Sequence, residues 1–449
     1  MDPAMENPRR RRSSVSASAS VPSPLGSARQ TPAVSRTSSN TNVNPRLSSR
    51  SRSASHANSS SDDAEQEKAL NSTPKAYIIL EACKRKEISR LRCLAESPGG
   101  FLTDTLRRRA WPILLGLDTP QDDQHDLASP QDASYSDWKE LSRHRDEDQV
   151  QLDVNRSFIY YPNMADMSDA ELSLRKSELS CLITEVLRRY PYLCYFQGYH
   201  DISQVFLLVL APAWRARMLA RLSVLRIRDF MLPSFGPTTA QLRLLPDILH
   251  AADPKLRRHL AGIEPFYALA GTLTMYAHNI DNYRDIARLF DVFLVREPVF
   301  SVYVFAQIIL DRRHEIFEID EPDMLHVILG KVPANLDLDE LIINSAKLFE
   351  NHPPETLQYW QKISSASALK TARDVEACAK QTMEEGEKLF ERQVKEVEWS
   401  EMQDRIKLTL WAYRRPAKAI GMALMVGVLA IYIRRNSTAM HHVASFFSR

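Results

Sequence analysis

Two short stretches carry the side chains best suited to chemistry on a phosphate. Residues 150–158 have the sequence VQLDVNRSF, with Asp153 and Arg156, and residues 195–201 have the sequence YFQGYHD, with Gln197. An arginine guanidinium is always charged, and its planar fork matches phosphate oxygens. A glutamine amide both donates and accepts hydrogen bonds, so it can hold a water molecule against a phosphate. Together these side chains suit stabilisation of a phosphoryl-transfer reaction.

The loops with which proteins usually bind nucleotides are absent from the sequence. There is no P-loop, no G-x-G-x-x-G, no H-E-x-x-H metal motif and no nucleophile elbow. Only 12 of the 449 residues are glycine, which does not favour a loop that cradles phosphates. We therefore expect the chain to bind no nucleotide by itself and to have no cofactor or metal of its own.

Two further motifs flank these stretches. The first is L-R-x-x-A-W-x-x-L-L-G at residues 106–116, with Arg107, Trp111 and Gly116. The second is R-L-F-D at residues 288–291, with Arg288 and Asp291. With V-x-x-D-x-x-R at 150–156 and Y-x-Q-G at 195–198, four elements follow one another in a fixed order. In this order they resemble the TBC domain, the helical domain of Rab GTPase-activating proteins, over about residues 75–350.

The resemblance implies a role for each matched residue. Arg156 would be an arginine finger, a side chain inserted into the nucleotide site of a partner GTPase, where such an arginine is worth roughly 10³–10⁵ in rate. Gln197 would be a glutamine finger that replaces the GTPase's own glutamine. Asp153 would position the arginine segment, through a carboxylate–arginine contact, and Tyr195 and Gly198 would shape the glutamine segment.

The same resemblance implies what the chain does and does not contain. It would activate a Rab-family small GTPase in its GTP form rather than hydrolyse GTP itself, so GTP and Mg²⁺ would belong to the partner. His200 and Asp201 are interpreted as packing or support for the glutamine segment rather than as a catalytic dyad. The alternative is a non-catalytic, membrane-anchored scaffold that binds a Rab without accelerating hydrolysis.

The charge balance argues against nucleic acid as a partner. Lysine and arginine number 58 against 56 acidic residues, so the formal net charge is only +2. The basic residues are nevertheless uneven, because residues 1–70 form a Ser- and Arg-rich tail without aromatic side chains. Such a composition predicts a disordered segment. Its Arg-Arg-Arg-Arg-Ser-Ser run would suit a basophilic kinase or an anionic membrane surface, but a solvated linker without a dedicated partner is the favoured interpretation.

The elements that must position these residues are predicted to be helices. Apolar residues recur at spacings of three and four, and no hairpin signal is present, so we expect an all-α fold. One helix is expected over 78–94, another over 103–116, and a third follows a capping box at 168–171. Further helices are expected near 199–210, 213–229, 239–250, 255–261, 264–277, 282–295, 298–310, 322–329 and 337–350. Residues 118–137 are expected to form a polar loop, and residues 351–413 a helical stalk or linker.

An apolar run of 15 uncharged residues, 419–433, lies near the end of the sequence. A spanning helix needs about 20 residues, with a range of roughly 17–25. Lys418 can extend its aliphatic stem along the apolar region, which lengthens the usable span back to Pro416. Basic residues flank the run, and Trp411 and Tyr432 lie where interfacial aromatic residues occur. We therefore predict a transmembrane tail anchor at 416–433.

The anchor predicts a location as well. The catalytic domain would face the cytosol, and residues 434–449 would form a short luminal tail. A short span favours a thin bilayer, such as that of the endoplasmic reticulum. With the resemblance to the membrane-anchored branch of the family, this predicts an endoplasmic reticulum or early Golgi membrane and a Rab of vesicle traffic between these compartments. The mitochondrial outer membrane is the competing location.

Overall fold

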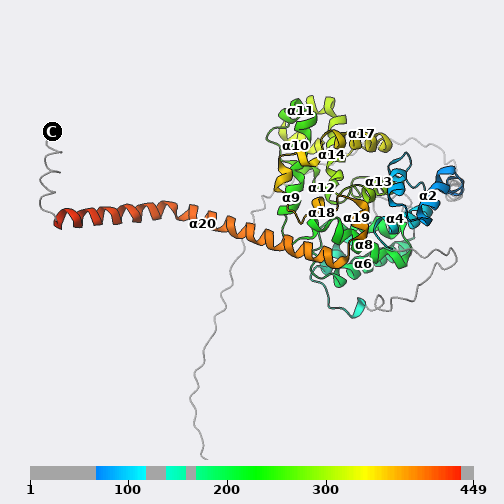
Figure 1. Ribbon diagram of the computed structural model, residues 1–449, viewed down its shortest axis with the longest axis horizontal. Coiled ribbons are helices and arrows are strands. Elements are labelled where there is room, and N and C mark those ends of the chain that lie inside the picture. The colour runs from blue at the N-terminus through cyan, green and yellow to red at the C-terminus, as the bar shows by residue number, and fades with distance from the viewer. Residues whose placement is uncertain (1–66, 118–137, 158–167, 436–449) are drawn as a thin grey trace, which may run out of the picture. The chain divides into compact units, whose positions relative to one another are not determined.

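The computed structural model describes residues 67–117, 138–157 and 168–435 (Figure 1). All regular secondary structure in these ranges is helical, with no strand among them. The prediction of an all-α fold is therefore confirmed. Three predicted segments lie outside the described residues: the tail up to residue 66, the loop at 118–137 and the C-terminal residues 436–449. Residues 67–70, predicted as part of the disordered tail, are helical instead.

The first part of the helical domain supplies both stretches of chemical interest. Here α denotes an α-helix and η a short 3₁₀ helix. In chain order the elements are α2 (Pro74–Lys84), α3 (Ile88–Glu96), α4 (Asp104–Leu114), η2 (Trp138–Glu140), α5 (Glu147–Asn155), α6 (Asp169–Arg189), α7 (Tyr199–Val209), α8 (Pro212–Leu225) and η4 (Arg228–Met231). Helix α6 packs against α5, α7 and α8.

The second part of the domain packs around α13 and α14. Its elements are α9 (Gly236–Leu242), α10 (Leu244–Ala252), α11 (Pro254–His259), η5 (Pro265–Ala268), α12 (Leu269–Leu273), α13 (Tyr283–Val295), α14 (Phe300–Asp311), α15 (Arg313–Phe317), α16 (Pro322–Leu329) and α17 (Leu338–Asn351). Helix α14 packs against α17 and α10, while α13 reaches α3, α4 and α7. Ten consecutive residues of α13, 286–295, are buried.

Local capping explains where several helices begin. The Ser168 hydroxyl accepts a hydrogen bond from the Glu171 amide at 3.3 Å, and the Glu171 carboxylate accepts one from the Ser168 amide at 3.1 Å. This reciprocal pair is the predicted capping box, and it satisfies two amides that have no partner within the helix. The Asn282 side chain caps α13 in a similar way.

Four predicted helices are interrupted in the structure. The one expected over 213–229 is divided into α8 and η4, and the one over 239–250 into α9 and α10. The helix expected over 78–94 is divided into α2 and α3, because Lys86 adopts the left-handed conformation with φ of 53°. The helix expected over 264–277 is only η5 and α12, followed by Met275 and Tyr276 with φ of 50° and 67°. At Met275 and Tyr276 the neighbouring side chains are still buried, so the apolar pattern does not reveal the turn. At Lys86 the turn lies in the exposed run 84–86, between two apolar segments that the prediction joins into one helix.

The Asp291 carboxylate on α13 is the polar centre of the domain. It is fully buried and accepts hydrogen bonds from the Arg107 side chain at 3.0 Å and from the Trp111 indole at 2.8 Å. The Phe101 amide donates to its second oxygen at 3.0 Å. Both arginine and indole come from α4, so this carboxylate joins the first and the last of the four sequence motifs.

Arg288 connects a second set of elements one turn earlier on α13. Its guanidinium donates to the carbonyl oxygens of Ala95 and Ser97 at 2.7 and 3.1 Å. It also pairs with Asp339 on α17 at 3.0 Å. The end of α3, helix α13 and the start of α17 are therefore held together by one side chain.

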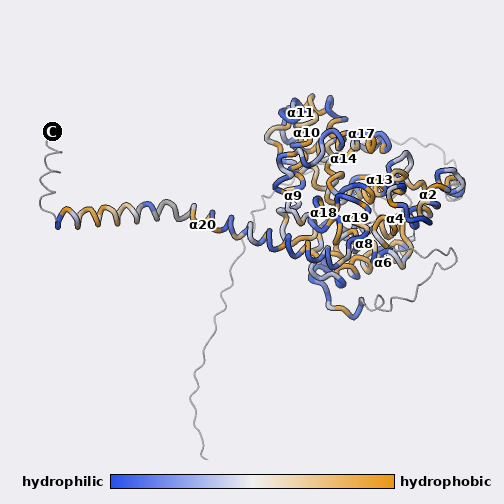
Figure 2. The backbone as a smooth tube through the Cα atoms, viewed as in Figure 1, coloured by the Kyte–Doolittle hydropathy of each residue, from blue (hydrophilic) through white to orange (hydrophobic). Residues whose placement is uncertain are grey.

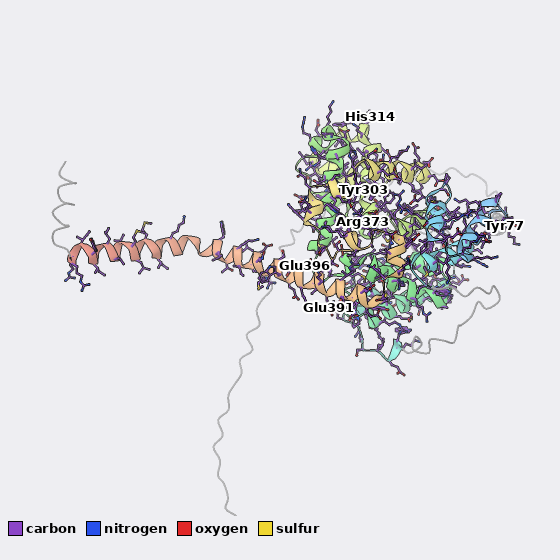
Figure 3. All side chains as sticks on the ribbon, viewed as in Figure 1. Tyr77, Tyr303, His314, Arg373, Glu391 and Glu396 are labelled. Atoms are coloured by element: carbon purple, nitrogen blue, oxygen red, sulfur yellow. The ribbon has the colours of Figure 1, made fainter. Side chains whose placement is uncertain are left out.

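Residues 351–398 pack against the domain, whereas the sequence predicts them as a stalk or linker. This segment holds η6 (Pro354–Thr356), η7 (Tyr359–Lys362), α18 (Ala368–Thr371), α19 (Val375–Lys380) and the start of α20 (Met383–Arg435). Arg373, which is labelled among the helices of the domain in Figure 3, pairs with Glu297 at 2.6 Å and with Glu355 at 2.5 Å. Phe390 is buried against the core. The apolar residues of this segment are too sparse to show along the sequence that their side chains are covered, whereas the rest of the predicted stalk, 399–413, is helical.

Two buried networks attach this C-terminal segment. Gly116, with φ of 74°, lets the chain approach α19 so closely that a Cβ there would be 1.7 Å from the Ala379 carbonyl oxygen. Arg221 on α8 donates to that same oxygen at 3.0 Å. Asp229 accepts a hydrogen bond from Gln393 on α20 at 2.8 Å and one from the Ala368 amide at 2.9 Å.

Helix α20 changes character along its length. Its first turns pack against α8, while the large apolar side chains from Trp399 onward are exposed, and its last turns are coloured as hydrophobic in Figure 2. Among the helices of the described ranges, none has an apolar stretch sufficient to cross a membrane. The tail anchor at 416–433 stays a prediction.

The Asp291 network makes a prediction about stability. Asp291→Ala leaves the Arg107 guanidinium, whose side chain is 6% exposed, with only its contact to Asp104 at 3.0 Å, and it also removes the acceptor of the Trp111 indole. We expect it to lower the free energy of unfolding by about 3–5 kcal/mol, the cost of breaking a buried ion pair by removing one partner. Urea denaturation followed by circular dichroism measures this change. If Asp291→Ala does not fold, Asp291→Asn keeps the shape and removes only the charge.

A matched control is available on α20. Asp404 pairs with Lys407 at 2.9 Å but is 64% exposed, so Asp404→Ala is expected to change stability by no more than about 0.5 kcal/mol. A loss of under about 1 kcal/mol for Asp291→Ala would contradict the central place given to this carboxylate.

Candidate functional site

Arg156 lies at the C-terminal end of α5 and is exposed. Its amide donates to the Asp153 carbonyl oxygen at 3.0 Å, which fixes the backbone at this position. Within the described residues, its side chain makes no hydrogen bond or ion pair. The Asn155 carbonyl oxygen next to it accepts a hydrogen bond from Lys176 on α6 at 2.6 Å. The guanidinium therefore projects from an anchored helix end.

The resemblance implies a contact between the Asp153 carboxylate and the Arg156 guanidinium, but the structure does not show one. The buried Asp153 carboxylate accepts a hydrogen bond from the Tyr195 hydroxyl at 3.0 Å and one from Gln149 at 2.9 Å. The difference follows from burial, because Asp153 points into the domain while Arg156 points out of it. Asp153 thus joins the arginine segment to the glutamine segment through Tyr195.

Several contacts hold the backbone of the glutamine segment, residues 194–198. The Cys194 amide donates to the Met231 carbonyl oxygen at 2.8 Å, and the Tyr195 amide donates to the Asp146 carboxylate at 2.9 Å. The Phe196 ring packs edge-on against Phe230 at 5.9 Å between centroids. Each of the three residues before Gln197 is therefore fixed by a different neighbour.

Gly198 sets the turn between this segment and α7. Its φ of 104° lies in the region that favours glycine. A Cβ at this position would lie 2.6 Å from the Thr274 methyl carbon, so any larger residue would clash with the segment that follows α12. The turn directs Gln197 to the surface, where its side chain is exposed and makes no hydrogen bond within the described ranges.

The Tyr195 hydroxyl is positioned between the Asp153 carboxylate and the His200 ring. It donates to Asp153 and also contacts the His200 ring at Nδ1 at 3.2 Å. Burial, followed by the charge of Asp153, raises the pKa of Tyr195, so the phenol keeps its proton as a donor. His200 in turn faces Asp201 at 3.3 Å.

Sequence reasoning missed three of these supporting residues. Gln149, Asp146 and His278 all contact the network, the last through Asp201 at 3.2 Å. Gln149 lies four residues before Asp153 on α5, a spacing that could have indicated the contact. Asp146 and His278 are distant in sequence from the residues they contact, and no pattern along the chain marks them.

The geometry suits chemistry on a partner's phosphate rather than on a small molecule held by this chain. Two exposed polar side chains, one cationic and one amide, are carried by segments joined at a buried hydrogen bond. Because the backbone of each segment is fixed, only the two side chains have to take up their positions when a phosphate arrives. Among the described residues no three His, Cys, Asp or Glu side chains gather as metal ligands. That the chain lacks a cofactor of its own stays a prediction.

Comparison with known proteins relates the sequence of this chain to one protein family. A sequence model of the Rab-GTPase-TBC domain matches residues 104–317. The chain is 33% identical over 300 residues to the GTPase-activating protein gyp10 of Schizosaccharomyces pombe, an alignment that covers 65% of this chain and 77% of that protein. It is 32% identical over 324 residues to TBC1 domain family member 20 of Homo sapiens, covering 71% and 75% respectively.

Among solved structures, the Ypt/Rab-GAP domain of Gyp1p aligns with a TM-score of 0.48 at 16% identity, covering 58% of this chain and 92% of that one. The sequence relatives align over three quarters of their own length, and the matched region of the family model contains Arg107, Arg156, Gln197 and Asp291. The chain therefore belongs to the Rab-GTPase-TBC domain family.

Proposed function

We propose that this chain is a GTPase-activating protein for a Rab-family small GTPase, and that Arg156 and Gln197 are its arginine and glutamine fingers. The observation that carries the proposal is the hydrogen bond from Tyr195 to Asp153 at 3.0 Å. It joins the two segments at positions only three residues before Arg156 and two before Gln197. Family membership and the names of the relatives supply the class of partner.

Each finger has a separate chemical task. In the transition state of GTP hydrolysis, negative charge is spread over the transferred phosphoryl oxygens, and Arg156 would stabilise that charge with two parallel N–H donors. Gln197 would accept a hydrogen bond from the attacking water and donate to the γ-phosphate, which orients the water for attack. GTP and Mg²⁺ would come with the GTPase, so the chain itself only completes the partner's active site.

Substitution of the fingers tests this function. We expect Arg156→Ala and Gln197→Ala each to slow stimulated hydrolysis on the responsive Rab by at least about a hundredfold, since an arginine finger contributes roughly 10³–10⁵. Arg156→Lys keeps the charge but loses the fork, so it should rescue little. Single-turnover GTP hydrolysis on a panel of Rab proteins gives the rates.

Arg85→Ala serves as the matched control, since Arg85 is also an exposed arginine at the end of a helix. Its rate is expected to equal that of the unmodified chain. If a Rab responds to the unmodified chain and neither finger substitution slows it by about tenfold, the assignment of the fingers is wrong. If a Rab binds and no Rab of the panel is stimulated, the chain is instead the non-catalytic scaffold.

We also propose that the C-terminal part of α20 attaches the chain to a membrane of the endoplasmic reticulum or early Golgi, where its Rab acts in vesicle traffic. The support is the row of exposed apolar side chains on α20: Ile420, Met422, Leu424, Met425, Val426, Val428, Leu429 and Ile431. They face more than one side of the helix, so a single protein partner groove would not cover them all. Lys418, Arg434 and Arg435 flank the run with positive charge.

Charged substitutions test the attachment. We expect the full chain in cell membranes to resist alkaline extraction. The double variant Leu424→Arg/Val428→Arg should be extracted, because each arginine at the centre of a spanning helix costs about 2.5–3.5 kcal/mol of insertion free energy. Leu408→Arg/Leu410→Arg is the control, since these exposed leucines lie on the same helix outside the run. The attachment would be contradicted if the unmodified chain is extracted, or if the control variant is extracted to the same extent as Leu424→Arg/Val428→Arg. Fluorescence microscopy distinguishes the endoplasmic reticulum from mitochondria.

A further inference from the structure

Asp201 occupies an unusual position beside the glutamine segment. It is the third residue of α7, in the first turn, where a carboxylate is favoured by the helix dipole. Its side chain is only 13% exposed. None of the four family motifs includes it, and the fingers do not require it to touch the phosphate.

Asp201 lies between two histidine rings. One carboxylate oxygen, Oδ1, faces His200 Nε2 at 3.3 Å, and the other, Oδ2, faces His278 Nδ1 at 3.2 Å. The Oδ2 atom is buried and makes no other polar contact in the described ranges, and the His278 ring at 3.2 Å is the group placed to donate to it. Since a buried carboxylate oxygen without a donor is costly, the two side chains hold each other in place.

The contacts continue from Asp201 back to the arginine segment. His200 Nδ1 faces the Tyr195 hydroxyl at 3.2 Å, and that hydroxyl donates to Asp153 at 3.0 Å. A series of polar contacts thus runs from Asp153 on α5 to His278, which follows α12. Gln197 and Gly198 lie within the stretch of chain, 195–201, that this series holds.

The segment that carries His278 is itself fixed in a strained conformation. Met275 and Tyr276 have φ of 50° and 67°, values that side chains with a Cβ rarely adopt. The buried Tyr276 hydroxyl donates to the Ser301 carbonyl oxygen at 2.8 Å, which holds the turn. The same turn places the Thr274 methyl group against Gly198. Strain of this kind persists where the surroundings determine the backbone, and it often occurs at functional sites.

We propose that Asp201 and His278 are positioning residues for the glutamine finger: they fasten the glutamine segment to the turn at 274–278 and thereby fix the direction of Gln197. The inference rests on the proposed function and deepens it. Neither residue would touch the partner's nucleotide.

The charges around His278 support a firm contact. The hydrogen bond to Asp201 raises the pKa of His278 above its ordinary value, and the nearby charge of Asp281 acts in the same direction. A histidine that keeps more of its proton makes a charge-assisted bond to the carboxylate, which is stronger than a neutral one. Loss of the bond would remove the contact between the first turn of α7 and the turn at 274–278, while Cys194, Tyr195 and Phe196 stay anchored by their own contacts.

The test measures kcat and KM for stimulated GTP hydrolysis on the responsive Rab, with the full chain and its variants. We expect Asp201→Ala and His278→Ala each to lower kcat about tenfold with KM changed less than about twofold, since misplacement of a catalytic group by about 1 Å can cost up to a hundredfold. His278→Asn should restore most of the rate, because its amide nitrogen can take the place of Nδ1. His278 is half exposed, so His278→Ala is expected to fold even if Asp201→Ala does not.

Background variants separate positioning from a general structural role. With Gln197→Ala already present, His278→Ala should cause no further loss of kcat, because the effects of coupled residues are not additive. With Arg156→Ala present, His278→Ala should again lower kcat about tenfold, because the effects of independent residues add. A further tenfold loss of kcat in the Gln197→Ala background, or an unchanged kcat for His278→Ala alone, would overturn the inference. The proposed function would still stand in that case, as long as the finger variants are defective. If the finger variants have no defect, the proposed function is wrong and the inference is wrong with it.

Discussion

The hydrogen bond between the Tyr195 hydroxyl and the Asp153 carboxylate is the interaction on which the arrangement of the site depends. It is the point where two segments separated by about forty residues of sequence meet, and it lies close to both exposed side chains. Because Asp153 is buried and Tyr195 keeps its proton, the bond forms in a low-dielectric setting where it is stronger than in water. An arginine and a glutamine can then be presented together by two segments of one chain.

This bond needs a rigid framework, and the domain supplies one through a second buried carboxylate. Asp291 joins α13 to α4, while Arg288, one turn away on the same helix, reaches α3 and α17. Residues 351–398 add further support, because Arg221 and Gly116 fasten α19 to the domain and Gln393 fastens α20. The cost of burying these charges is offset only if every partner is present, so the network specifies one arrangement of helices.

Much of the fold could be predicted from the sequence, and the reasons are local. Helical periodicity, the capping box at Ser168 and the glycine after α4 each act over a few residues, so they are visible along the chain. The motifs marked Arg107, Arg156, Gln197 and Asp291, but only the structure brings Arg107 to Asp291 and Tyr195 to Asp153. The pairing of Asp153 with Tyr195 rather than with Arg156 depends on which side of α5 is buried.

Other features could not be predicted, because they depend on contacts between distant residues. The left-handed turns at Lys86 and at Met275 and Tyr276 lie inside stretches that the apolar spacing predicts as single helices. The packing of residues 351–398 rests on single buried side chains such as Phe390 rather than on a repeated pattern. His278 had no signal at all, since its partner Asp201 lies 77 positions earlier in the sequence.

The most direct test of the account is the rate of Rab GTP hydrolysis stimulated by Tyr195→Phe. This change removes one hydroxyl and keeps the ring that packs against Tyr199. If the bond to Asp153 presents the two fingers together, kcat should fall by about ten- to a hundredfold, while stability falls by only about 1–3 kcal/mol. A kcat equal to that of the unmodified chain would contradict the claim that this hydrogen bond organises the site.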